Sequence, residues 1–216
     1  MKVIGVNGGP RKKWNTATLL SKALEGAASQ GAGTETVHLY DLNFKGCISC
    51  FACKTIGGKS YGKCAVKDDL TAVLDKVEGI DAMILASPIY FGTVTGEMRS
   101  FMERLLFPYL AYTNPPATLF PRRINTGFIY TMNAPEERIG QHGGQHIGLN
   151  EMMLKMVFGT AESLMSFETY QFDDYSKVVS GLFDVQQRAK RRKEVFPVDC
   201  DQAFEMGARL AGKTAG

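Results

Sequence analysis

The stretch Asn7-Gly8-Gly9-Pro10-Arg11-Lys12-Lys13-Trp14-Asn15-Thr16-Ala17-Thr18 separates two differently patterned segments. The preceding residues 3–6 form a short apolar run that predicts a β-strand, and apolar residues after the stretch recur at helical spacing. A strand that turns through glycines into a helix directs several backbone N–H groups at one point, where the helix dipole also favours negative charge. The stretch therefore predicts a strand–turn–helix unit whose turn binds a mononucleotide phosphate.

Three side chains of this turn strengthen the prediction, because Asn15 and Thr16 add donors at the helix start and Arg11 adds a fixed positive charge. The alternative interpretation is an ordinary connection between a strand and a helix, where Gly, Pro and Asn are common. The turn lacks the G-x-G-x-x-G pattern of dinucleotide-binding folds. Residues 58–60 resemble the end of a Walker A motif, but Cys53 stands where that motif needs glycine.

The bulk properties limit the classes of protein to consider. The chain has 216 residues, of which 44% are hydrophobic, enough for one large domain with a sizeable core. Its net charge of +3 is too small to suggest nucleic acid or a membrane surface as a partner. No apolar run approaches the ~18 residues of a membrane helix, and the N-terminal residues show no signal-peptide pattern. We therefore expect a cytoplasmic protein that binds neither nucleic acid nor membranes.

Strand and helix patterns alternate along the chain, which is typical of a parallel sheet with helices on both faces. Predicted strands cover residues 3–6, 34–39, 81–87, 124–132 and 163–170. Predicted helices cover residues 16–30, 70–77, 96–106, 149–157 and 199–211. Between them we expect a surface excursion at 107–122, a mobile loop at 135–148 and a C-terminal extension from about residue 171. The pattern predicts one domain over residues 1–216, a flavodoxin-like doubly wound α/β fold with five parallel strands in the order 2-1-3-4-5.

A second ligand-binding loop, Ser87–Gly96, follows the third predicted strand. In the predicted order this strand lies beside the first, at the point where the order reverses and ligands usually bind. Tyr90 and Phe91 offer flat apolar surfaces there, and Gly92 allows the backbone to approach a ring. A planar ring beside this loop, with its phosphate on the first loop, describes flavin mononucleotide, FMN. The alternative is that Tyr90 and Phe91 are core residues of a turn between strand and helix.

With both loops in view, the chain resembles the NADPH-dependent FMN reductase family of the flavodoxin-like superfamily. Residues 8–16 match its G-S-P-R-K-x-x-N-T motif except at Gly9, and residues 87–96 match S-P-x-Y-F-G-S-V-T-G almost completely. The resemblance spans most of residues 1–106. It implies an oxidoreductase that takes electrons from NADPH or NADH and passes them from FMN to a small molecule or a protein. It also implies a homodimer or homotetramer, with contacts at residues 107–122 and 171–196.

The same resemblance assigns the cofactor-binding residues. The residues assigned to the phosphate are Gly9, Arg11, Asn15, Thr16 and Ala17. The residues assigned to the isoalloxazine ring are Pro88, Ile89, Tyr90, Phe91 and Gly92. Gly9 replaces the usual Ser, so its backbone N–H must serve in place of a hydroxyl. The loop near Asn133 is a further candidate contact of the ring. No catalytic side chain is expected, because the cofactor carries out the electron transfer and the protein positions it.

Four of the five cysteines fall within residues 47–64, a crowding that suggests metal or redox chemistry. Cys47, Cys50 and Cys53 have ferredoxin-like spacing, and Cys64 follows after a longer gap. They resemble the cysteine motif of iron–sulfur flavoproteins in the same family, although that subgroup places its fourth cysteine closer. The alternatives are a [4Fe–4S] cluster, zinc or unmetallated thiols. They lead to two further hypotheses, an electron carrier that exchanges electrons with ferredoxin and a non-enzymatic flavin and thiol redox sensor.

Overall fold

The protein is built around a parallel β-sheet in the order β2-β1-β3-β7-β8, as seen in a computed structural model that describes residues 1–142 and 144–212. The strands of this sheet are β1 (Lys2–Asn7), β2 (Gly33–His38), β3 (Ala82–Tyr90), β7 (Asn125–Thr131) and β8 (Glu162–Ser166). The pairs along it are all parallel, and the short β4 (Thr93–Val94) pairs antiparallel with β3. The predicted order 2-1-3-4-5 and the flavodoxin-like class are thereby confirmed.

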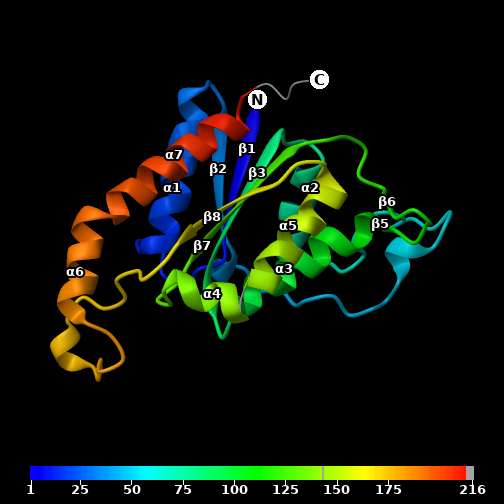
Figure 1. The fold of residues 1–216 in the computed structure, drawn as a ribbon. Coiled ribbons are helices and arrows are strands. Elements are labelled where there is room, and N and C mark those ends of the chain that lie inside the picture. The colour runs from blue at the N-terminus through cyan, green and yellow to red at the C-terminus, as the bar shows by residue number, and fades with distance from the viewer. Residues whose placement is uncertain (143, 213–216) are drawn as a thin grey trace.

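Helices cover both faces of the sheet, as predicted (Figure 1). On one face lie α1 (Asn15–Ser29) and α7 (Phe196–Leu210), and on the other lie α2 (Leu70–Val77), α3 (Gly96–Leu106) and α5 (Gly144–Phe158). Successive residues of β3 alternate between the two cores, with Met83 and Leu85 in one and Ala82 and Ile84 in the other. This two-sided burial explains why β3 is apolar almost throughout.

The helices α1 and α7 approach each other closely at two glycines. A Cβ atom on Gly26 would overlap the carbonyl of Phe204, and one on Gly207 would overlap the carbonyl of Ala23. The C-terminal helix is therefore packed directly against the helix that begins at the predicted phosphate-binding turn. Any residue larger than glycine at these positions would force the two backbones apart.

The connections differ more from the prediction than the strands do. The excursion at 107–122 contains a short 3-10 helix, η3 (Phe107–Tyr109), and a hairpin of β5 (Leu110–Ala111) with β6 (Ala117–Thr118). The prediction of a mobile loop at 135–148 is wrong, because α4 (Glu136–His142) and the start of α5 occupy it. Ile139 and Ile147 pack against the core there, which outweighs the low helix propensity of the glycines. Gly143 lies outside the described residues.

The segment after β8 runs along the outside of the molecule before the chain returns as α7 (Figure 1). It contains η4 (Tyr175–Lys177) and α6 (Val185–Glu194). Asp184 caps α6 by accepting hydrogen bonds from the backbone N–H groups of Gln186 and Gln187. The remaining 3-10 helices are η1 (Leu39–Asp41) and η2 (Ala52–Lys54), before and within the cysteine segment. Within the described ranges, none of the helices has the length and apolar character that crossing a membrane requires.

Candidate cofactor pocket and cysteine loop

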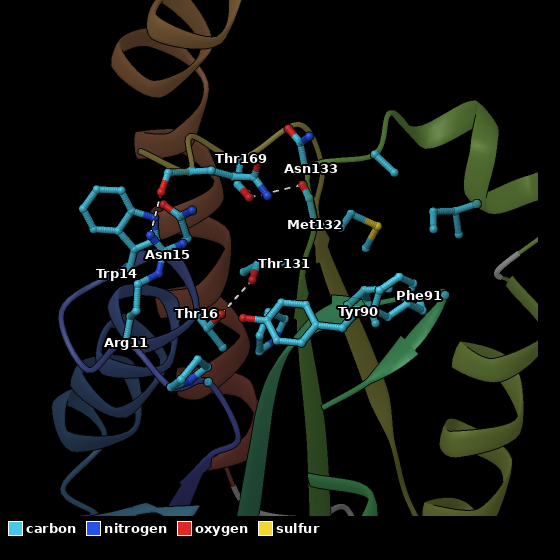
Figure 2. Close-up of a pocket in the computed structure, with 18 of the residues that line it drawn as sticks. Arg11, Trp14, Asn15, Thr16, Tyr90, Phe91, Thr131, Met132, Asn133 and Thr169 are labelled. Carbon is cyan, nitrogen blue, oxygen red and sulfur yellow. Dashed lines mark hydrogen bonds between the residues drawn. The ribbon is translucent and has the colours of Figure 1, made fainter. Parts of the chain in front are cut away.

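Three loops at the carboxyl edge of the sheet enclose a pocket of about 340 Å³ (Figure 2). They are the turn between β1 and α1, the turn between β3 and β4, and the segment after β7. The pocket lies at the β1/β3 switch point, where open α/β sheets usually bind ligands, and its volume is typical of small-molecule sites. Nine of the ten residues assigned to FMN line it: Gly9, Arg11, Asn15, Thr16, Pro88, Ile89, Tyr90, Phe91 and Gly92. The tenth, Ala17, is half-buried in the first turn of α1.

The turn between β1 and α1 is fixed by hydrogen bonds to the neighbouring strand and helix. The Gly8 N–H donates to the carbonyl of Ala86 at 2.8 Å, and the Thr95 hydroxyl donates to the carbonyl of Gly8 at 2.7 Å. A side chain on Gly8 would collide with Met98 of α3. Gly9 donates its N–H to Asn7 Oδ1 at 2.8 Å, inside the turn itself. The turn is thus preorganised before any ligand arrives.

The first turn of α1 leaves backbone donors available. Within the described residues, the N–H groups of Asn15, Thr16 and Ala17 donate no hydrogen bond, and Trp14 at the helix start provides no side-chain cap. Free N–H groups at a helix start favour an anion through hydrogen bonds and the helix dipole. This end of the pocket is therefore suited to a phosphate group.

A segment that sequence reasoning did not foresee, residues 169–171, closes the same end of the pocket (Figure 2). The carbonyl of Tyr170 accepts from Trp14 Nε1 at 2.9 Å and from Asn15 Nδ2 at 2.8 Å, and the carbonyl of Gln171 accepts from Arg11 at 2.6 Å. The side chains of Arg11 and Asn15 therefore hold this segment as well as lining the pocket. No local pattern in the sequence predicts these contacts, because they join residues more than 150 positions apart.

The turn between β3 and β4 places two residues in the left-handed region. Tyr90 pairs with Thr93 across the turn, and its two central residues, Phe91 and Gly92, have φ of 51° and 82°. Two positive φ angles define a type I′ turn, which Asn-Gly normally fills. Phe91 is fully exposed and Tyr90 is 45% exposed, so the alternative that both are core residues is wrong. Such backbone strain in a bulky residue is often found at ligand sites.

The third loop contributes an unpartnered acceptor to the pocket wall. The side-chain oxygen of Asn133 is buried, and within the described residues it receives no hydrogen bond. The backbone carbonyl of the same residue accepts from Arg188 at 3.0 Å. Buried polar atoms are almost always paired, so this oxygen is suited to a donor on a ligand. The loop near Asn133 therefore lines the pocket, and its contact with a flavin ring remains a prediction.

The four clustered cysteines belong to segment 47–64, which passes beside α3 and comes close to the hairpin of β5 and β6 (Figure 1). Cys47, Cys50, Cys53 and Cys64 line one cavity of about 20 Å³. Cys47 and Cys50 are exposed, whereas Cys53 is buried, and burial raises the pKa of the Cys53 thiol. All four cysteines therefore line the same cavity. This donor set is the one that four-cysteine iron–sulfur clusters use.

The cavity between the thiols holds about one water molecule, less space than a four-iron cluster needs. In residues 1–142 and 144–212, no three Cys, His, Asp or Glu side chains are grouped as a metal site. Four thiols are therefore the right ligands for a [4Fe–4S] cluster, but the cysteine side chains would have to move apart to make room for it. The predicted metal ligands remain a prediction.

Two cations from the chain hold the cysteine loop against α3. The fully buried Arg104 donates to Cys64 Sγ at 3.3 Å, to the Lys45 carbonyl at 3.2 Å and to the Val66 carbonyl at 3.0 Å, and it pairs with Asp68. The ammonium group of Lys54 donates to the carbonyls of residues 107, 108 and 110 and lies 4.5 Å from the ring of Phe107. Arg104 thus ties the two ends of the loop to α3, and Lys54 ties its middle to the residues that follow α3.

The sheet order and the pocket at its switch point define the flavodoxin-like class of α/β proteins. The family model described as NADPH-dependent FMN reductase matches residues 1–119 of the chain. This match covers more than half of the sequence, and the chain belongs to that family. It includes both ligand loops and the cysteine loop, and it ends before the third pocket loop.

Several relatives in sequence are iron–sulfur flavoproteins. One from Methanocaldococcus jannaschii is 40% identical over 104 residues, which is 48% of this chain and 51% of the relative. One from Archaeoglobus fulgidus is 37% identical over 109 residues, which is 50% of this chain and 47% of the relative. The chain therefore spans about half the length of the curated relatives it matches.

Similar solved structures cover nearly the whole chain at low identity. An NAD(P)H:quinone oxidoreductase from Methanothermobacter marburgensis superposes with a TM-score of 0.70 at 14% identity, over 99% of this chain and 98% of that one. An FMN-dependent NADH-azoreductase from Bacillus anthracis, solved in complex with FMN, gives 0.68 at 11% identity, over 98% and 100%. At these identities the likeness shows the fold alone.

Proposed function

We propose that this protein is an FMN-dependent oxidoreductase that takes electrons from NADPH or NADH. The observation that carries the proposal is the convergence of three loops on one pocket whose two ends differ in chemistry. One end has the free N–H groups of the first turn of α1, and the other has the exposed aromatic side chains of Tyr90 and Phe91. Membership of the FMN reductase family supports the proposal.

Each part of the pocket has a separate task in this proposal. FMN supplies the electron-transfer chemistry when bound, and the protein binds and orients it. The free N–H groups of the first turn of α1, including that of Ala17, hold the phosphate together with Arg11. Gly9 lines this end of the pocket, but its N–H already donates to Asn7 Oδ1 and does not replace the missing serine hydroxyl. The segment Pro88–Gly92 supports the ring, while Asn133 Oδ1 accepts a hydrogen bond from its polar edge. Because Phe91 projects into solvent, the pocket stays open to a second planar ligand on that side.

The test is to offer FMN to the purified protein, freed of any bound flavin, and to follow quenching of its fluorescence. We expect saturation at one FMN per chain. Anaerobic mixing of the FMN-loaded protein with NADPH, and separately with NADH, is expected to bleach the visible absorbance and to identify the preferred donor. A protein that takes up no FMN contradicts the proposal, and a loaded protein that neither nucleotide reduces contradicts the assigned donor.

A second candidate function is electron transfer by an iron–sulfur flavoprotein, in which the cysteine loop holds a [4Fe–4S] cluster and ferredoxin is the partner. The shared cavity of Cys47, Cys50, Cys53 and Cys64 favours it, and so do the relatives of that name. Anaerobic purification followed by iron and sulfide analysis tests it, with about four of each expected per chain. Cys64→Ser should abolish both, whereas the matched change at Cys200, in α7, should not. A protein that contains zinc, or that contains no metal, would contradict the electron-carrier function and favour the redox-sensor hypothesis.

We also propose that the chain forms a homodimer or homotetramer in the cytoplasm. Exposed apolar side chains in the two expected contact segments support this proposal, namely Tyr112 in 107–122 and Val179 and Leu182 in 171–196. The electron acceptor is proposed to be a small molecule or a protein. Light scattering of the purified protein measures the assembly, and a monomer would contradict it.

A further inference from the structure

Three arginines of α6 differ in how their charge is balanced. Arg188 pairs with Glu168 at 2.5 Å, and Arg191 pairs with Asp199 at 2.8 Å. Arg192 has no carboxylate partner within the described ranges, although it is half-buried. A cation removed from water without a counter-charge is unfavourable, so its position calls for an anion from outside the chain.

The surroundings of Arg192 indicate where that anion binds. Its guanidinium donates to Asn15 Oδ1 at 2.7 Å and stacks on the ring of Phe196 at 4.2 Å, and burial lowers its pKa. Asn15 is a pocket-lining residue at the first turn of α1. Arg192 thus engages the amide oxygen of Asn15, while the amide NH2 group of Asn15 donates to the carbonyl of Tyr170 at 2.8 Å.

Arg11 repeats this arrangement from the other side of the same end of the pocket. Its guanidinium lies 4.6 Å from the ring of Trp14 and donates to the carbonyl of Gln171. It too has no carboxylate partner among the residues that the structure describes. Two arginines are therefore held by aromatic rings and neutral oxygens around the first turn of α1, and in the described ranges neither is paired with a carboxylate.

We infer that Arg192 is a positioning residue for the phosphate end of the pocket, where it fixes the amide of Asn15 and adds positive charge behind it. The inference rests on the proposed function, since it assumes that the ligand is a phosphate monoester such as FMN. It extends that function to α6, which lies beyond the residues that the family model matches. The contact joins residues 177 positions apart in the sequence.

The test compares FMN with riboflavin, which has the same ring and no phosphate. Arg192→Gln is expected to weaken FMN binding about tenfold and to leave riboflavin binding unchanged, since a hydrogen bond and charge near the dianion are lost. Lys193→Gln is the matched control, because it removes the same charge from an exposed neighbour on α6 and should change neither affinity. A purely structural role for Arg192 would weaken both ligands equally.

Arg192→Lys keeps the charge and is expected to lower FMN affinity less than the glutamine variant, again without affecting riboflavin. If Arg192→Gln does not fold, the lysine variant alone tests whether Arg192 supports phosphate binding. An unchanged ratio of FMN to riboflavin affinity in the folded variants overturns the inference while leaving the proposed function intact. A wild-type protein that binds neither flavin overturns the proposed function instead.

Discussion

The cofactor pocket and the cysteine loop are held in place in different ways. The pocket is formed by the ends of strands and the start of a helix, so the sheet itself brings its three loops together. The cysteine loop has little regular structure of its own, and side chains such as Arg104 and Lys54 tie it to α3 and the residues after it. Two of its residues, Ser49 and Phe51, have φ of 55° and 54°.

The pocket is thus held in place by the pairing of strands, whereas the cysteine loop is held by hydrogen bonds from single side chains. A site at strand ends changes little when one side chain is altered, because backbone pairing still fixes its loops. A loop held by a buried cation depends on that one residue, since removing it leaves several polar groups without partners. The pocket and the loop are therefore expected to respond differently to mutation, and the predictions below test this difference.

The largest effect is expected from Arg104→Met. The change leaves the carboxylate of Asp68 and the carbonyls of Lys45 and Val66 without their donor, and we expect the free energy of unfolding to fall by about 3 kcal/mol. FMN affinity should be unchanged if the pocket and the cysteine loop are independent. A loss of FMN affinity together with stability would show that they are not. The control is Arg99→Met on the same helix, an exposed partner of Glu103, with an expected change below about 0.5 kcal/mol.

A smaller effect is expected from overpacking the pocket turn with Gly8→Ala. A Cβ atom there would lie 2.8 Å from Met98 Cβ, so the turn and α3 must move apart, at about 1–3 kcal/mol in unfolding free energy. FMN affinity should also fall, because the displaced turn carries the first-turn N–H groups. Gly96→Ala, in open space at the start of α3, serves as control and should not destabilise the protein. Denaturant titration and FMN titration measure the two effects.

Phe91→Asn is expected to change stability in the opposite direction. Asparagine tolerates the left-handed conformation that Phe91 adopts and forms the preferred Asn-Gly pair with Gly92, so unfolding free energy should rise by about 1 kcal/mol. FMN affinity should fall, because an exposed aromatic surface at the ring end of the pocket is lost. A variant that is less stable, or that binds FMN as well as the wild type, would show that the strained phenylalanine serves no ligand.

The smallest expected effect is a difference among the cysteines in their rates of alkylation, which involves no change in stability. Iodoacetamide should alkylate Cys47 and Cys50 before Cys53, since Cys53 is buried and its pKa is raised, so less thiolate is present. Raising the pH should reduce the difference in alkylation rate between Cys53 and the other two cysteines. Peptide mass spectrometry after brief labelling of metal-free protein measures the order. Equal rates at all three thiols would show that the loop is open rather than tethered.

Much of the scaffold was predictable because its signals are local. The apolar run before Ser87 and the helical spacing before Leu106 each depend on burial of a continuous face, and the observed β3 and α3 contain those segments. The segment 135–148 was mispredicted because its glycines favour a loop locally, whereas packing of Ile139 and Ile147 on the core decides the outcome. The fifth strand ends at Ser166, earlier than the predicted 170.

The candidate site divides in the same way. Both glycine-containing loops were visible in the sequence, since a turn that follows a strand and precedes a helix has a recognisable composition. The 169–171 segment and Arg192 of α6 were not, because their contacts with Arg11 and Asn15 span 155 residues or more. Residues 188–193 form a basic run, and only the structure shows that Arg188 and Arg191 in it form ion pairs, whereas Arg192 is half-buried without a carboxylate partner in the described ranges.

The sequence by itself determined the order of strands and helices and the two turns that line the pocket, because periodicity and turn chemistry act over a few residues. Only the tertiary structure decided which cations are neutralised, which thiols share a cavity and which distant carbonyls close the phosphate end. Those outcomes depend on packing between segments far apart in the chain, where geometry selects one partner among many of equal chemistry.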